Sequence, residues 1–205
     1  MFFGGESFSA KLAEILLSLP AVVWAITFHE FCHGYAAMKL GDRTAELDGR
    51  LSLNPLHHLD PIGALCLLLF RFGWAKPVPI DSRYFKKPRR DMIIVSLAGA
   101  AGNILTAFVF AKLYIFFPVL FSSYAASQFV RIMIYMNVGL AAFNLLPIPP
   151  LDGSRILYVF LPYKWMDFYY KLEQYGMFII MGLIMLNVLP ILMTPLQSLI
   201  LYLIF

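Results

Sequence analysis

Two histidines and a glutamate lie close together in the first third of the chain, where residues 29–33 read His-Glu-Phe-Cys-His. These residues lie in a helical pattern, and positions i and i+4 of a helix lie on one face. His29 and His33 can therefore bind one metal ion together. Glu30 is rotated from His29 by about 100° around the helix, close enough to take a proton from a water molecule beside that ion. The spacing is typical of zinc-dependent hydrolysis.

The composition of the chain indicates a membrane protein. Of its 205 residues, 60% are hydrophobic and 14% are charged, and the mean hydropathy is +0.75. Soluble domains average about 45–50% apolar and about 25% charged residues. A soluble protein with a large core is the alternative, but it would have nowhere to bury so much apolar surface.

The membrane setting changes the interpretation of the three polar residues. A five-residue motif can occur by chance, and a single histidine on an apolar face is usually an ordinary core residue. Here His29, Glu30 and His33 interrupt an apolar segment. Ionisable side chains within a membrane are costly and usually functional. The setting favours a metal site over a chance match.

A catalytic zinc site needs a third protein ligand and leaves a fourth position open. Four residues are candidates from the sequence: His57, His58, Asp60 and Asp152. Asp152 comes after an apolar segment and a proline-rich stretch, and Gly153 permits tight backbone geometry behind it. Asp152 could instead cap the helix that begins there. The residues alone leave this choice open.

The apolar segments predict an all-α polytopic membrane protein with three transmembrane helices and one or more C-terminal spans. The expected spans are 11–40, which contains a proline at position 20, then 92–120, 132–146 and a final region 175–205. Residues 44–53 alternate in character around an Asp-Gly pair and predict a small β-hairpin. The apolar run 62–70 is too short to span and predicts a re-entrant piece.

The positive charges predict the orientation of the chain. Seven of the sixteen lysines and arginines fall between residues 71 and 91. A short basic loop between apolar segments marks the cytoplasmic face, so the candidate metal ligands lie toward the cytoplasmic side. No nucleic-acid-binding motif accompanies these charges.

The two cysteines, Cys32 and Cys66, lie in apolar surroundings and indicate no disulfide framework. The N-terminus lacks the basic region of a cleavable signal peptide.

Three stretches together resemble the site-2 protease family of intramembrane zinc metalloproteases, of the small bacterial type in peptidase family M50. They are the H-E-x-x-H at 29–33, Asn-Pro-Leu-His-His-Leu-Asp-Pro at 54–61, and the segment from Asn144 to Leu-Asp-Gly at 151–153. Their order and their membrane setting make the match specific. The resemblance implies that His29, His33 and Asp152 hold one Zn²⁺ per chain and that Glu30 is the catalytic base.

The resemblance also implies roles for further polar residues. Asn144 and Asn103 are candidates for contacting the substrate carbonyl or the oxyanion. The family usually has Gly-Pro where this chain reads Gly-Ala-Ala-Gly before Asn103. The second-motif loop contributes Asn54, His58 and Asp60, which are expected to shape the loop rather than bind zinc.

The function expected from this resemblance is hydrolysis of peptide bonds in or near transmembrane segments of membrane proteins, known as regulated intramembrane proteolysis. The partners are then a transmembrane protein substrate and the lipid bilayer of the cell membrane, with no nucleic acid, and the oligomeric state stays open. We expect a single domain over 1–205, with its catalytic core in about 9–160 and no PDZ or CBS domain.

Three alternatives remain. A metal transporter would need ionisable groups in several spans, and the spans between 92 and 146 carry little beyond Lys112 and Arg131. A catalytically inactive binding relative would lack the glutamate or a ligand, and neither is missing. A membrane protease of the prenyl-processing type is the nearest enzymatic alternative, and the Leu-Asp-Gly context of Asp152 counts against it.

Overall fold

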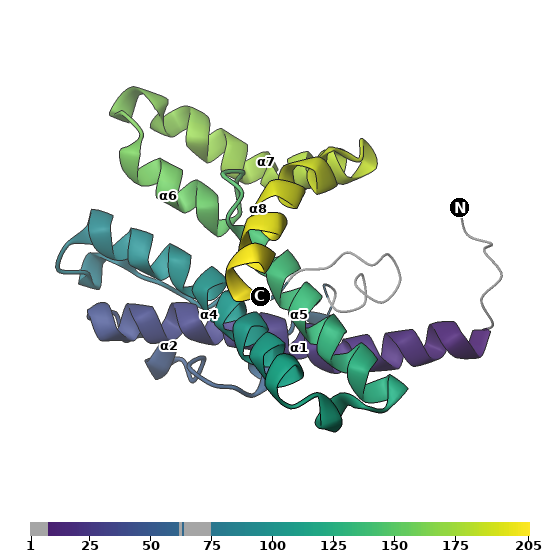
Figure 1. Ribbon diagram of the computed structural model, residues 1–205. Helices are drawn as coiled ribbons and strands as arrows, with labels where there is room; N and C mark the ends of the chain where they lie inside the picture. The colour runs from purple at the N-terminus through teal and green to yellow at the C-terminus, as the bar shows by residue number, and fades with distance from the viewer. Residues whose placement is uncertain (1–7, 62, 64–74) are drawn as a thin grey trace.

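The computed structural model describes residues 8–61, 63 and 75–205, and it is built from helices (Figure 1). The α-helices are α1 (Phe8–Leu40), α2 (Thr44–Leu47), α4 (Pro88–Phe116), α5 (Tyr124–Asn144), α6 (Asp152–Phe160), α7 (Met166–Met185) and α8 (Val188–Ile204). Short 3-10 helices lie between them: η1 (Pro55–His57), η2 (Ser82–Tyr84), η3 (Pro118–Phe121) and η4 (Tyr163–Trp165).

Helices α1, α4 and α5 pack against one another and form the centre of the molecule (Figure 1). Each of the three is long and apolar enough to cross a membrane. Where α4 meets α5, the buried residues are mostly small or β-branched, such as Ala107, Ala111 and Val138, and such residues let helices approach closely. The expected core of three transmembrane helices is therefore confirmed.

The predicted β-hairpin over residues 44–53 is wrong. Thr44–Leu47 form the short helix α2, and Gly49 ends it with a positive φ of 66°. The Gly49 N–H donates to the Glu46 carbonyl, and the Arg50 N–H donates to the Ala45 carbonyl. This pair of bonds is the usual glycine cap of a helix C-terminus. The Asp-Gly pair was interpreted as a hairpin turn because both structures require a residue that tolerates positive φ.

The described part of the chain contains no β-strand, and a single isolated bridge pairs Leu59 with Ala75. The short apolar run predicted to be re-entrant, 62–70, falls outside the described residues apart from Gly63.

The C-terminal apolar region consists of two helices. Helices α7 and α8 are bent by 89° with respect to each other, and they add a fourth candidate span if they are counted together. The break lies at Asn187, which has a φ of 55°, and not at either proline. Pro190 stands in the first turn of α8, where a missing N–H costs no helix hydrogen bond, and Pro195 lies inside the helix.

Candidate metal centre

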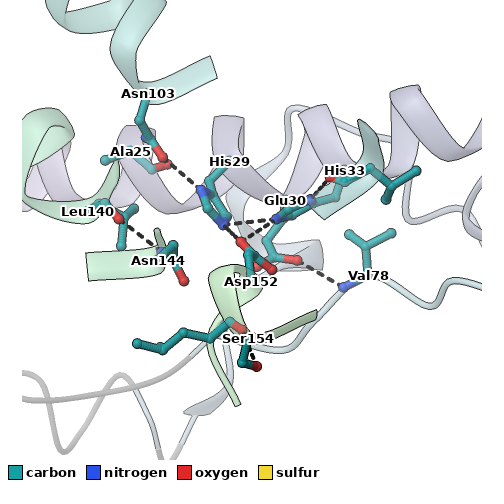
Figure 2. A network of polar contacts seen from close by, with 12 residues as sticks. Ala25, His29, Glu30, His33, Val78, Asn103, Leu140, Asn144, Asp152 and Ser154 are labelled. Atoms are coloured by element: carbon teal, nitrogen blue, oxygen red, sulfur yellow. Dashed lines mark hydrogen bonds and ion pairs between the residues drawn. The ribbon is translucent and has the colours of Figure 1, made fainter. Parts of the chain in front are cut away.

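Three side chains from distant parts of the chain meet at one point between α1 and α6. His29 and His33 come from the second half of α1, and Asp152 is the first residue of α6 (Figure 2). The two Nε2 atoms lie 3.0 Å apart, and they lie 3.1 and 3.0 Å from Asp152 Oδ2. All three residues are buried, with 5%, 5% and 8% of their surface exposed. The structure therefore brings together the three residues that the sequence analysis proposed as ligands.

The hydrogen-bond partner of Nδ1 in each imidazole decides which ring nitrogen carries the proton. His29 Nδ1 lies 2.7 Å from Asn103 Oδ1, and His33 Nδ1 lies 2.7 Å from the Val95 carbonyl oxygen. Both oxygens can only accept, so each Nδ1 donates and each neutral Nε2 keeps a free lone pair. Two lone-pair nitrogens and a carboxylate oxygen then surround one point, and a cation there would relieve their repulsion. Nitrogen and oxygen donors of this kind suit Zn²⁺, and the outer hydrogen bonds are those that usually orient histidine ligands.

Two glycines of α4 make room for side chains of α1, and one of them lies against the histidines. A Cβ added to Gly99 would lie 2.6–2.7 Å from ring atoms of His29 and closer still to His33 Nε2. A Cβ added to Gly102 would lie 2.5 Å from Cys32 Sγ. Real Cβ atoms do not come so close to other heavy atoms. At Gly99 the space that a side chain would need is occupied by the imidazoles of His29 and His33.

The chain between α5 and α6 turns sharply and delivers Asp152 to the histidines. Gly153 packs against the carbonyl oxygens of Leu145 and Leu146 so closely that no side chain would fit. The Ser154 hydroxyl donates to the Leu151 carbonyl and closes the first turn of α6. The prolines of this stretch restrict the backbone further. The Asp-Gly pair thus combines a candidate ligand, Asp152, with the close packing at Gly153 that places it.

Glu30 lies beside the three candidate ligands in a cavity of about 380 Å³. Its Oε2 accepts a hydrogen bond of 2.9 Å from the Val78 N–H (Figure 2). Apart from the polar residues, the cavity is lined mainly by apolar side chains, among them Ile26, Val78, Leu140, Phe143, Leu151 and Ile180. A carboxylate, three candidate ligands and an apolar lining therefore share one space.

The two asparagines proposed to contact substrate have different positions. Asn144 lines the cavity, and its side-chain nitrogen donates to the Leu140 carbonyl at 3.0 Å. Asn103 is fully buried behind His29 and is not among the residues that line the cavity. Its position suits the orientation of His29 rather than contact with a substrate. Asn144 is therefore the asparagine that a bound peptide could reach.

The second-motif loop lies apart from the three ligands and is held by its own hydrogen bonds. Asn54 Oδ1 caps η1 by accepting from the Leu56 N–H, and Asp60 Oδ1 accepts from the Gly63 N–H. His58 is fully buried, and its Nε2 lies 2.7 Å from the Ser52 carbonyl oxygen. These three side chains thus bond to the backbone of their own loop.

Several residues around the centre were not predicted from the sequence. Asn137 of α5 is fully buried and hydrogen-bonded to Asn103. Arg155 lines the cavity one turn after Asp152. A signal for Asn137 was present, because an amide inside an apolar span is itself a sign of function. The main-chain partners, the Val95 carbonyl and the Val78 N–H, had no signal in the sequence.

The fold and the centre define a multi-pass membrane protein in which three buried side chains can hold a metal ion beside a carboxylate. The sequence profile described as Peptidase family M50 matches residues 119–187, the segment that contains Asn144 and Asp152. No solved structure matches the chain.

Three curated relatives have names of the same kind. "Putative zinc metalloprotease YwhC" of Bacillus subtilis (strain 168) is 39% identical over 88% of this chain and 82% of its own length. "Putative zinc metalloprotease MJ0611" of Methanocaldococcus jannaschii is 30% identical over 77% of this chain and 74% of its own length. "Putative zinc metalloprotease Rip2" of Mycolicibacterium smegmatis is 31% identical over 69% of this chain and 56% of its own length. The chain belongs to peptidase family M50, as the resemblance of its motifs implied.

Proposed function

We propose that this protein is an intramembrane zinc metalloprotease that cleaves peptide bonds in or near transmembrane segments of other membrane proteins, and so takes part in regulated intramembrane proteolysis. One observation carries the proposal. His29, His33 and Asp152 meet beside Glu30 in one cavity, and the first two belong to a helix that is long and apolar enough to cross a membrane. A soluble metalloprotease would not need a site within such a helix.

The residues have complementary roles in the proposed hydrolysis. A zinc ion held by His29, His33 and Asp152 would supply a Lewis acid that polarises the scissile carbonyl and makes water more acidic. Glu30 takes the proton from the attacking water and then delivers it to the leaving amine. The free amide N–H of Asn144 is available to donate to the oxyanion that forms. The apolar lining of the cavity holds the peptide and limits the access of bulk water.

The substrate must be locally extended before it can be cut. The carbonyl groups of a transmembrane helix are all used in its own hydrogen bonds. A helical substrate would therefore present no free carbonyl to Glu30 and Asn144. We propose that substrates are membrane proteins whose spans unwind easily near the cleavage site, for example at glycine or proline.

We also propose that the active site faces the cytoplasm and that the membrane is the cell membrane. Lys86, Lys87 and Arg89, just before and within the first turn of α4, are exposed and support a cytoplasmic position for that end of the helix. Single cysteines at Ser82 and Ser122 of a cysteine-free variant should differ in labelling by an impermeant thiol reagent in intact cells. Labelling at Ser82 but not at Ser122 would contradict this orientation.

We further propose that residues 1–205 act as one membrane domain, with the catalytic core in about 9–160. Helix α4 contacts α1, α5, α6 and α8, which supports a single packing unit.

A metal transporter is the main rival function. His29, His33 and Asp152 gather at one buried centre, whereas transport requires a continuous polar path through the spans.

Glu30→Gln is the test of the proposed function, because the amide keeps the size of the side chain but cannot take a proton. Proteins that accumulate uncut in cells carrying this variant identify a substrate, which is then assayed with purified protein in lipid vesicles. We expect cleavage to fall by about 10²–10⁴-fold while the zinc content stays at the wild-type level.

The matched control is Glu46→Gln, which changes a partly exposed glutamate of α2 that pairs with Arg43. It should cleave at the wild-type rate. Cleavage by Glu30→Gln at a rate close to wild type would show that Glu30 is not the base. If the wild type cleaves no substrate, and Glu30→Gln transports zinc across the vesicle membrane as fast as the wild type does, the metal transporter is favoured.

A further inference from the structure

A chain of buried hydrogen bonds runs from α5 through α4 to His29. Asn137 Nδ2 donates to the Met133 carbonyl at 2.8 Å, and Asn137 Oδ1 accepts from Asn103 Nδ2 at 2.9 Å. Asn103 Nδ2 also donates to the Ala25 carbonyl at 2.9 Å, and Asn103 Oδ1 accepts from His29 Nδ1. Asn103 and Asn137 are both fully buried. The chain therefore connects three membrane-spanning helices to one candidate ligand.

The chemistry of each partner decides which atom donates and which accepts at every step of this chain of hydrogen bonds. The Met133 carbonyl can only accept, so the amide nitrogen of Asn137 must face it and the oxygen of Asn137 must face Asn103. Asn103 then has both of its N–H groups occupied, by Asn137 and by Ala25. Its oxygen is left for His29, whose Nδ1 must donate. The Nε2 lone pair of His29 consequently points toward Asp152.

We propose that Asn137 is a positioning residue that holds the Asn103 amide in place and, through it, sets the tautomer and the ring orientation of His29. The proposal rests on the proposed function, since it assumes that His29 Nε2 binds zinc. Asn137 itself does not line the cavity, so it acts only through Asn103.

His33 shows why such a chain is needed at His29. The Nδ1 of His33 bonds to a main-chain carbonyl, that of Val95. A main-chain carbonyl cannot reverse its direction, whereas a side-chain amide can exchange its oxygen and nitrogen by rotation. The orientation of His33 is set by the α4 backbone alone. The orientation of His29 depends on a side chain that needs partners of its own.

The test uses leucine, which has nearly the shape of asparagine and no hydrogen-bonding group. Zinc affinity is measured by competition with a chelator for purified wild type, Asn137→Leu, Asn103→Leu and the double variant. We expect Asn137→Leu to weaken zinc binding by about tenfold, at the low end of the effect of residues that orient metal ligands. Asn103→Leu should weaken it at least as much. The double variant should be no weaker than Asn103→Leu.

Melting temperatures separate positioning from folding. Each single variant leaves one buried amide without its partner, whereas the double variant removes both. The double variant should therefore melt above both single variants and still bind zinc weakly. Nitrogen NMR of labelled histidines should show a proton on His29 Nδ1 in the metal-free wild type and a mixture of tautomers in Asn137→Leu.

Thr106→Val is the matched control. Thr106 is buried on α4, and its hydroxyl accepts from Trp24 of α1 without contact to His29. The control should bind zinc like wild type. Wild-type zinc affinity in Asn137→Leu, or losses that multiply in the double variant, would overturn the inference alone. A wild-type chain that binds no zinc would overturn the proposed function and the inference with it.

Discussion

The molecule contains two pairs of histidines in different kinds of structure. His29 and His33 stand four residues apart on α1, and their Nε2 atoms converge on Asp152. His57 and His58 are adjacent residues at the end of η1, and each ring bonds to a different loop carbonyl, those of Gly49 and Ser52. The first pair shares a centre with a third residue, whereas the second pair fastens a loop.

The difference lies in spacing and in which nitrogen is engaged. One turn of helix places two side chains on the same face, whereas neighbouring residues point in different directions. In the first pair the Nδ1 atom of each ring donates to a buried oxygen. The Nε2 atom is then free to bind a metal ion. Histidine content alone is therefore a poor guide to metal binding, and the partner of each ring nitrogen is a better one.

Removal of a proposed ligand should produce the largest difference in zinc content between variants of the two histidine pairs. His29→Ala, His33→Ala and Asp152→Ala should each reduce zinc from about one per chain to near none after desalting, because each leaves two protein ligands. His57→Ala should retain about one zinc per chain. Elemental analysis of protein purified in detergent measures both. Stoichiometric zinc in Asp152→Ala would remove that residue from the site.

Gly99→Ala should have an intermediate effect and would sharpen the comparison, since only the first pair packs against a glycine of α4. The added methyl group would displace the imidazoles, and we expect zinc affinity to fall by about 10–100-fold, as for other changes that move ligands. Alanine favours helices over glycine by about 1 kcal/mol, so instability of α4 would not explain the loss.

Gly139→Ala serves as the control for this change. Gly139 lies in α5, and an added Cβ would meet nothing nearer than Gln197 Nε2 at 3.9 Å. Zinc affinity should be unchanged. Equal losses from the two variants would show that any change in helix packing disturbs the centre.

His58→Ala should have the smallest effect on zinc and a measurable effect on stability. The variant loses a buried hydrogen bond, which lowers the free energy of unfolding by about 1–3 kcal/mol. His57 is exposed, and His57→Ala should change that free energy by less than about 0.5 kcal/mol. Thermal unfolding and zinc content are measured on the same samples. A fall in zinc content in His58→Ala would break the contrast between the two pairs.

The long helices and the meeting of His29, His33 and Asp152 were the parts that could be predicted from the sequence. Apolar length indicated α1, α4 and α5, although α5 begins at Tyr124 rather than near Ile132 because Ser123 caps it. The spacing of His29 and His33 indicated a shared ion. Asp152 was one of four candidates for the third ligand, and only the resemblance to a family selected it over His57, His58 and Asp60.

Local ambiguity and main-chain partners account for what could not be predicted. Gly49 suits a hairpin turn and a helix cap equally well, and only the bonds of Gly49 and Arg50 decide between them. The break before α8 falls at Asn187, in a left-handed conformation that asparagine adopts more readily than most other residues, whereas the nearby Pro190 and Pro195 are the stronger helix-breaking signals in the sequence. The contacts of Val78 and Val95 involve the backbone, which the identity of a residue does not reveal.

The distance along the chain between the ligands has a consequence for folding. His33 and Asp152 are 119 residues apart, so on the proposed ligand set an ion bound there joins α1 to α6 as a reversible cross-link. A ligand that binds only the folded chain stabilises it by about 2.7 kcal/mol at a hundredfold excess over its dissociation constant. Chelation should therefore lower the melting temperature of the wild type but not of His33→Ala. In a cell short of zinc, the amount of folded protein would fall together with its activity.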